Sequence, residues 1–357
     1  MPVQVDGPAG EPAVPAAAPP VAAASDWSNT GHDDGLVFAL ALDGSGGARP
    51  VDWTAVRNWP AEGSGSRQLW VHLDRMAPGA QDWLRNASGL HPVAVAALLE
   101  EETRPRCTAI GGGLLLILRG VNLNPGADLD EMISVRLWTD GRRVVSVRRY
   151  VMFAIRDVME LLRDGIGPAT CHGVAVQVAA HLGLRMAQTI QDLTEGVDAL
   201  EEEVIDNAQD QDLRRRLGET RRQAIAYKRY LAPQREALNG LSTLAGGELD
   251  EEMQLRLRET QDRFQRYVEE LDEVREHAAV VQDELANLRG ERMNRNMYVL
   301  TIVAAIMLPL GFVTGLLGIN VGGIPGAEDE SGFLWVLGIM AVLVVGQVIA
   351  FRFWRLF

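Results

Sequence analysis

The chain ends in two long apolar stretches that no charged residue interrupts. The first is Met297–Ile319, with 23 residues, and the second is Phe333–Phe351, with 19 residues. About 20 apolar residues in a helix cross the hydrocarbon core of a bilayer. The pattern therefore predicts a first transmembrane helix over 297–320, an outside loop over 321–332, a second transmembrane helix over 333–351 and a tail over 352–357.

The charges beside these stretches predict how the hairpin is oriented. Basic residues precede the first span, at Arg289, Arg292 and Arg295, and follow the second span, at Arg352 and Arg355. The loop between the spans has no Lys or Arg and carries Glu328, Asp329 and Glu330. Because basic residues stay on the cytoplasmic side, we predict that both termini are cytoplasmic and that the acidic loop lies outside, where it would attract cations.

A long helix without proline precedes the first span. Apolar residues recur at spacings of four and three, as in a heptad repeat. The stripe consists of Met253, Leu257, Thr260, Phe264, Tyr267, Leu271, Val274, Ala278, Val281, Leu285 and Leu288. We predict a stalk helix over 249–296 that buries this stripe against helices of the same chain or of other copies.

The N-terminal part reads as a tail followed by an α+β domain. Residues 1–34 contain several prolines and no continuous apolar core, which predicts a disordered tail. Residues 35–248 form the predicted cytosolic domain, with strands first and helices from Val151 onward. The predicted strands are Leu36–Leu42, Gln68–Leu73, Arg106–Ile110, Gly113–Arg119, Met132–Trp138 and Arg142–Arg149, and the predicted short helices are Gln81–Ala87 and His91–Glu101. Asp140-Gly141 predicts a hairpin turn.

Composition excludes several classes of protein. A formal net charge of −14 argues against a nucleic-acid partner. The acidic helical segment Gly183–Arg222 is either a solvated face or a collar that attracts cations, and the sequence leaves both open. Two distant cysteines and six scattered histidines give no disulfide or zinc-ribbon pattern. Without a nucleophile–base set, a phosphate loop or metal-ligand spacing, we expect neither an enzyme nor a bound cofactor.

One face of the first span carries small or polar residues, with two exceptions. The face consists of Asn294, Met297, Thr301, Ala304, Leu308, Gly311, Gly315 and Gly318, and Met297 and Leu308 are the bulky members. Small residues at this spacing allow close helix packing, whereas polar residues inside a span usually face protein or water. Asn294 and Thr301 favour a pore-lining face. One hairpin cannot enclose a pore, so this interpretation requires a homo-oligomer in the lipid bilayer.

The end of the first span resembles a known family. Gly318-Ile319-Asn320 closes the span, and Val321-Gly322-Gly323-Ile324-Pro325-Gly326 follows it. With the soluble domain, the long helix and the second span, this arrangement resembles the CorA-type divalent metal ion transporters. Most members read Gly-Met-Asn, and the variant with a Gly-Gly-Ile-Pro-Gly loop resembles the zinc transporter branch, ZntB.

The resemblance implies a homopentameric funnel in the bacterial inner membrane, with the first spans around the pore. Gly318, Ile319 and Asn320 would form the selectivity filter. The branch implies Zn²⁺ as the transported cation and possible coupling to protons. The chemistry itself suits any hydrated divalent ion, because amide oxygens can bind its water shell. A Mg²⁺/Co²⁺/Ni²⁺ transporter is therefore the alternative within the family, and a membrane-anchored coiled-coil scaffold is the alternative from another class.

Overall fold

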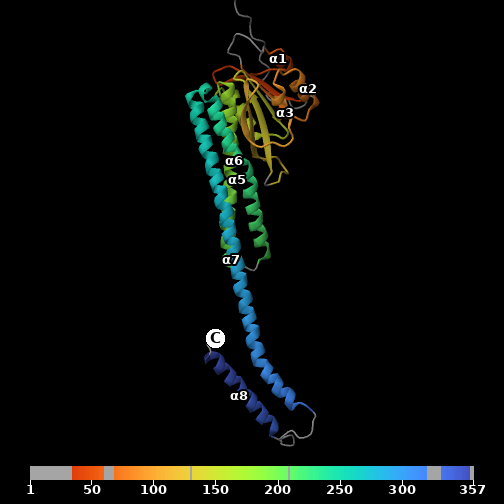
Figure 1. Cartoon of the computed structure of the whole chain (residues 1–357), viewed down its shortest axis with the longest axis vertical. Helices are drawn as coiled ribbons and strands as arrows, with labels where there is room; N and C mark the ends of the chain where they lie inside the picture. The colour runs from red at the N-terminus through yellow and green to blue at the C-terminus, as the bar shows by residue number, and fades with distance from the viewer. Residues whose placement is uncertain (1–33, 60–67, 129–130, 208–209, 320–330, 354–357) are drawn as a thin grey trace, which may run out of the picture. The chain divides into compact units, whose positions relative to one another are not determined.

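A computed structural model describes residues 34–59, 68–128, 131–207, 210–319 and 331–353 (Figure 1). The chain divides into two compact units. The first comprises Met1–Ala199 and Arg216–Ala278, and the second comprises Leu200–Arg215 and Ala279–Phe357. The domain limits that the sequence suggests stay predictions.

A seven-stranded sheet is the centre of the first unit among the described residues. Its strands are β1 (Leu36–Leu42), β2 (Ala48–Pro50), β3 (Gln68–Asp74), β4 (Arg106–Ile110), β5 (Gly113–Val121), β6 (Met132–Thr139) and β7 (Arg143–Arg148). They lie in the order β2-β1-β3-β7-β6-β5-β4. All neighbours are antiparallel except β3 and β7, which pair in parallel with Val71 opposite Val145.

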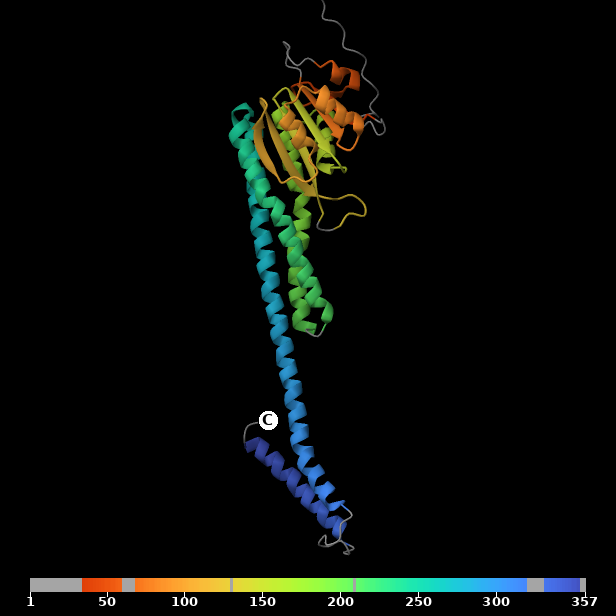
Figure 2. The same cartoon turned by 45° about the vertical axis from the view of Figure 1, so that its right-hand side comes forward.

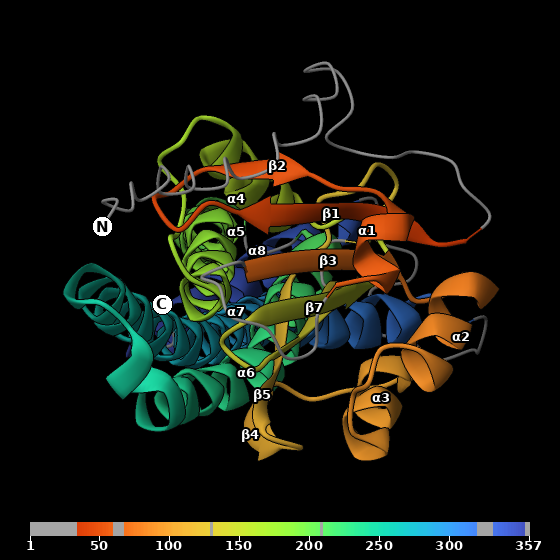
Figure 3. The same cartoon turned by 90° about the horizontal axis from the view of Figure 1, so that it is seen from above.

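Three short helices cover one face of the sheet: α1 (Trp53–Arg57), α2 (Pro78–Asn86) and α3 (Pro92–Leu99). Alternation along β3 sends Leu69, Val71 and Leu73 into the core formed with α2 and α3. The intervening residues Trp70 and His72 are also fully buried. Figure 3 shows the reason, since α5 to α7 lie on the other side of the sheet from α2 and α3.

Helices α4 (Phe153–Arg163), α5 (Cys171–Asn207), α6 (Gln211–Ala245) and the first part of α7 (Glu251–Leu317) follow the strands, with a 3-10 turn at Gly246–Glu248. Contacts to β5 hold two of them on the sheet. Gly120 leaves room for Leu182 of α5, because an added Cβ would lie 2.7 Å from its Cδ2. The amide of Gln234 in α6 pairs with both backbone groups of Arg119, accepting at 2.6 Å and donating at 3.0 Å.

The apolar stripe of the stalk is buried within its own chain. From Met253 to Leu285 every member of the stripe is at most 7% exposed. In the first unit, the hydroxyl of Tyr267 donates to the carbonyl of Gly183 in α5 at 3.0 Å, and Lys228 of α6 contacts Asp272 at 2.5 Å. This confirms the predicted stripe and decides between its two possible partners, because α5 and α6 cover it.

The strand predictions are confirmed with small shifts in their ends, as is the turn at Asp140-Gly141. Gly141 has φ +81°, and the Asp140 carboxylate accepts from the backbone N–H groups of Arg142 and Arg143. The order of strands first and helices after is too simple, because α1, α2 and α3 lie between strands. Strand β2 and helix α1 were not predicted, since three and five residues are too short to show a period.

Among the described residues, two helices contain a segment that is long and apolar enough to cross a membrane, and both segments lie in the second unit. These are the C-terminal part of α7 and α8 (Gly332–Phe353), which turns back along α7 (Figure 2). The two predicted apolar helices are therefore confirmed. Helix α7 continues through Gly290 and Pro309 to Leu317. No residue in its most apolar window is fully buried in the single chain, as expected for a surface that lipid or other helices cover.

His72 is a buried titratable residue in the first unit. Its Nδ1 lies 2.8 Å from the Ser146 hydroxyl, which also accepts from Trp70 Nε1, while Nε2 is buried without a hydrogen-bond partner. Burial, with a smaller contribution from Arg148, lowers the pKa of His72 well below its usual 6.5. The folded state therefore binds fewer protons here than the unfolded state does.

We expect the stability of the folded protein to fall as the pH drops below the pKa that His72 has in the unfolded state. As the pH falls from about 6.5 to 5.5, protonation of His72 in the unfolded state should lower the free energy of unfolding by at most about 1.4 kcal/mol. Chemical unfolding of the purified protein and of His72→Gln across this range measures the difference in slope. The substitution removes the titrating group, so its slope should be shallower; parallel slopes would show that His72 titrates normally in the folded protein.

Candidate ion pathway on helix α7

One side of α7 in its apolar part faces α8. The residues on this side are half-buried, whereas those around them are exposed. They are Ile302, Ala305, Ile306, Pro309, Leu310 and Val313, and their spacing of three and four is that of a single helix face. A direct contact supports this assignment, because Gln347 of α8 donates from Nε2 to the carbonyl of Ala305 at 3.2 Å.

The predicted pore face lies on the opposite side of α7. Its residues are all exposed in the single chain, namely Asn294, Met297, Thr301, Ala304, Leu308, Gly311, Gly315 and Gly318. At 3.6 residues per turn, this series and the face against α8 occupy opposite sides of the helix. The structure thus brings the predicted residues together on one side and leaves that side uncovered by α8.

Two threonines in this part of α7, Thr301 and Thr314, carry hydroxyl groups that bond to the helix backbone. Thr301 donates its hydroxyl proton to the carbonyl of Met297 at 2.8 Å, and Thr314 donates to that of Leu310 at 3.0 Å. A hydroxyl has one proton, so each oxygen is left as an acceptor for a partner outside the helix. Acceptors suit a cation or the water around it. Thr314, which the sequence interpretation omitted, lies about 140° around the helix from Thr301 at 3.6 residues per turn, so it stands outside the predicted pore face.

The end of α7 carries part of the predicted filter. The backbone N–H of Gly318 donates to the carbonyl of Thr314 at 2.9 Å, so the helical bonding reaches this residue. A Cβ on Gly318 would lie 3.0 Å from that carbonyl, so a side chain here would be in tight contact with the preceding turn. Ile319 is 49% exposed. Asn320 and the acidic residues Glu328, Asp329 and Glu330 lie outside the described residues.

No group of three or more His, Cys, Asp or Glu side chains in the described ranges could hold a metal ion. The polar side chains on the predicted pore face are the amide of Asn294 and the hydroxyl of Thr301. Such hard oxygen ligands suit a divalent cation that keeps part of its water shell. A metal ion here would be the transported substrate.

The fold and the uncovered face describe a class: an α/β body, a long helix that continues into an apolar segment, and a second apolar helix beside it. The chain belongs to the CorA-like Mg²⁺ transporter family, whose model matches residues 66–353. The family transports divalent cations, and this chain is assigned to that class of membrane protein.

Several known proteins are similar over most of their length. The divalent cation transporter CmaX of Pseudomonas aeruginosa is 40% identical over 91% of this chain and 96% of its own. The zinc transport protein ZntB of Yersinia enterocolitica is 32% identical over 87% and 92%. The solved full-length CmaX structure gives a TM-score of 0.76 over 92% of this chain and 99% of its own. The CorA magnesium transporter of Methanocaldococcus jannaschii, at 17% identity, shares the fold with a TM-score of 0.73 over 88% and 98%.

Adjacent alanines test the two faces of α7. Ala304 lies on the uncovered face, and Ala305 is half-buried against α8. In a Cys107→Ser/Cys171→Ala background, Ala304→Cys should react with a charged, membrane-impermeant thiol reagent at least about tenfold faster than Ala305→Cys, because the thiolate forms only where water reaches. Labelling followed by mass spectrometry measures both rates. Equal rates, or faster labelling of Ala305→Cys, would contradict a water-lined face.

Proposed function

We propose that this protein conducts divalent cations through a homo-oligomeric pore, a homopentamer, whose wall is the uncovered face of α7. The observation that carries the proposal is the separation of two faces on one helix. Apart from Ala305, bulky residues pack toward α8, while the residues that face away from it are small or hydroxyl-bearing except for Asn294, Met297 and Leu308. Since one hairpin cannot surround water, copies of α7 must meet around an axis. Small side chains then leave space between the helices, and polar groups supply contacts for water and ions.

The filter of this pore is Gly318-Ile319-Asn320 at the end of α7. Five Asn320 carboxamides would present oxygen acceptors to the water shell of an entering ion. Gly318 allows close approach of the backbones, since it has no side chain. The acidic loop residues Glu328, Asp329 and Glu330 raise the local cation concentration by attraction at the mouth.

Zn²⁺ is the proposed substrate, and the support comes from the Gly-Gly-Ile-Pro-Gly loop and from the ZntB relatives. Mg²⁺ is the second candidate, because the chemistry of an amide filter suits a hydrated ion and the family description names it. If transport is coupled to protons, the coupling groups lie outside the two apolar stretches, which contain no Asp, Glu, Lys, Arg or His. We place the protein in the bacterial inner membrane with both termini cytoplasmic, following the positive-inside rule.

Asn320→Ala tests the filter. The variant should lose divalent-cation flux by about tenfold or more in proteoliposomes, because the acceptor ring is removed. Its elution in detergent should match that of the wild type, because the proposed filter role concerns contact with the ion and not assembly. Asn86→Ala, which changes the same residue type on the exposed surface of α2, serves as the control. Wild-type flux through Asn320→Ala would refute the filter, and failure of the wild type itself to transport any divalent cation would favour the scaffold alternative.

A comparison of ions tests the substrate. Flux of Zn²⁺ and of Mg²⁺ into proteoliposomes is measured with fluorescent indicators, each with and without an inward proton gradient. We expect Zn²⁺ flux to exceed Mg²⁺ flux and to rise with the gradient. Preference for Mg²⁺ would overturn the zinc assignment, while Zn²⁺ flux that ignores the gradient would remove proton coupling alone.

A further inference from the structure

Pro309 interrupts the hydrogen bonding of α7 inside the apolar segment. In a helix, the carbonyl of residue 305 accepts from the N–H of residue 309. Proline has no N–H, and its ring also crowds the carbonyl four residues earlier. The carbonyl of Ala305 therefore lacks its usual helical donor. In hydrocarbon, where water cannot replace the missing bond, such a group costs free energy unless a neighbouring helix supplies a donor.

Gln347 of α8 supplies a donor at this carbonyl. Its Nε2 lies 3.2 Å from the oxygen of Ala305, 42 residues away in the sequence. Its Oε1 is buried without a partner among the described residues. The reverse orientation of the amide would place two acceptors together, so the contact with Ala305 fixes which end of the side chain points at α7.

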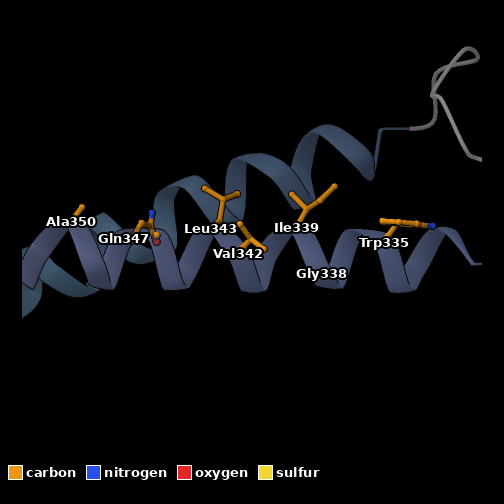
Figure 4. Close-up of a pocket in the computed structure, with 8 residues that line it drawn as sticks. Trp335, Gly338, Ile339, Val342, Leu343, Gln347 and Ala350 are labelled. Atoms are coloured by element: carbon orange, nitrogen blue, oxygen red, sulfur yellow. The ribbon is translucent and has the colours of Figure 1, made fainter.

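The surroundings make this bond distinctive. Gln347 lies along a groove of about 700 Å³ on α8, with Trp335, Gly338, Ile339, Val342 and Leu343 among the other residues that line it (Figure 4). Among the described residues that line this groove, it alone has an amide side chain. An amide in an apolar span is costly unless it is bonded. Both the carbonyl and the amide therefore depend on the same contact.

We propose that Gln347 is a positioning residue for transport: its amide replaces the N–H that Pro309 lacks and fixes α8 to α7 at the proline. The inference rests on the proposed role of α7 as the pore helix. Pro309 is on the face toward α8, and Leu308 is next to it on the uncovered face. A bond that sets the geometry of α7 at Pro309 therefore sets the position of a pore-facing side chain without touching the ion.

A double-mutant cycle tests the replacement. Gln347→Met keeps the length of the side chain and removes the donor, and it should lower divalent-cation flux by about three- to tenfold, in line with hydrogen bonds between membrane helices. Pro309→Ala returns an N–H to Ala305. In the Pro309→Ala background, Gln347→Met should therefore change flux by less than about twofold. Equal losses in both backgrounds would refute the proposal.

Two further variants separate positioning from simple packing. Gln347→Asn keeps the amide on a shorter side chain and should lose flux as Gln347→Met does. Gln347→Glu can donate only when it is protonated, and burial raises the pKa of a carboxyl group. Its flux relative to wild type should approach one at low pH and fall as the pH rises. The apolar stretches contain no other acid, base or histidine that could produce this profile. A ratio that does not depend on pH would contradict the donor role.

Thermal unfolding of the detergent-solubilised protein gives a readout that needs no transport. Gln347→Met should lower the midpoint by about 3 °C in the wild-type background and by less than about 1 °C with Pro309→Ala. If the wild type carries no divalent cation, the proposed function fails, and this cycle still decides whether Gln347 bonds to α7. Midpoints that shift equally in both backgrounds would overturn the pairing itself.

Discussion

A helix in hydrocarbon has to satisfy its backbone polar groups without water, and this constraint governs the second unit. It explains why Met297–Leu317 and Gly332–Phe353 are helical. It also explains why the position of Pro309 matters more than it would in a soluble helix. Once α8 covers one side of α7 and donates to Ala305, the remaining side of α7 is free for other contacts.

In the first unit, burial of apolar side chains is the constraint that determines how the sheet and helices are arranged. The sheet needs cover on both faces, because both sets of alternating residues in β3 are buried. Helices α1 to α3 supply one cover, and α5 to α7 supply the other. The stalk stripe is thereby used within the chain, on α5 and α6. In the proposed assembly, contacts between copies would therefore come from other surfaces, such as the uncovered face of α7.

The sequence predicted the elements whose pattern is long and regular. The stripe from Met253 to Leu285 and the two apolar helices follow from spacing, and both are present. Strand β2 and helix α1 could not be predicted, because such short elements show no period. The parallel pairing of β3 with β7 could not be predicted either, because pairing depends on the whole sheet. The contact of Gln347 with Ala305 was missed for another reason. It depends on the register of α8 against α7, which neither helix determines alone.

The family is established, whereas the pore face, the filter and the choice of metal are proposals. The most direct test of the central claim is block of divalent-cation flux by Cd²⁺ in Leu308→Cys, with Val313→Cys as the control on the face against α8 and Cys107→Ser/Cys171→Ala as the background. Copies of α7 around a pore would bring several of the introduced thiolates together on its axis, and soft thiolates bind such a metal tightly. We predict block in Leu308→Cys that a chelator reverses, and no block in Val313→Cys. Flux through Leu308→Cys that Cd²⁺ leaves unchanged, or equal block in both variants, would contradict a pore lined by this face of α7.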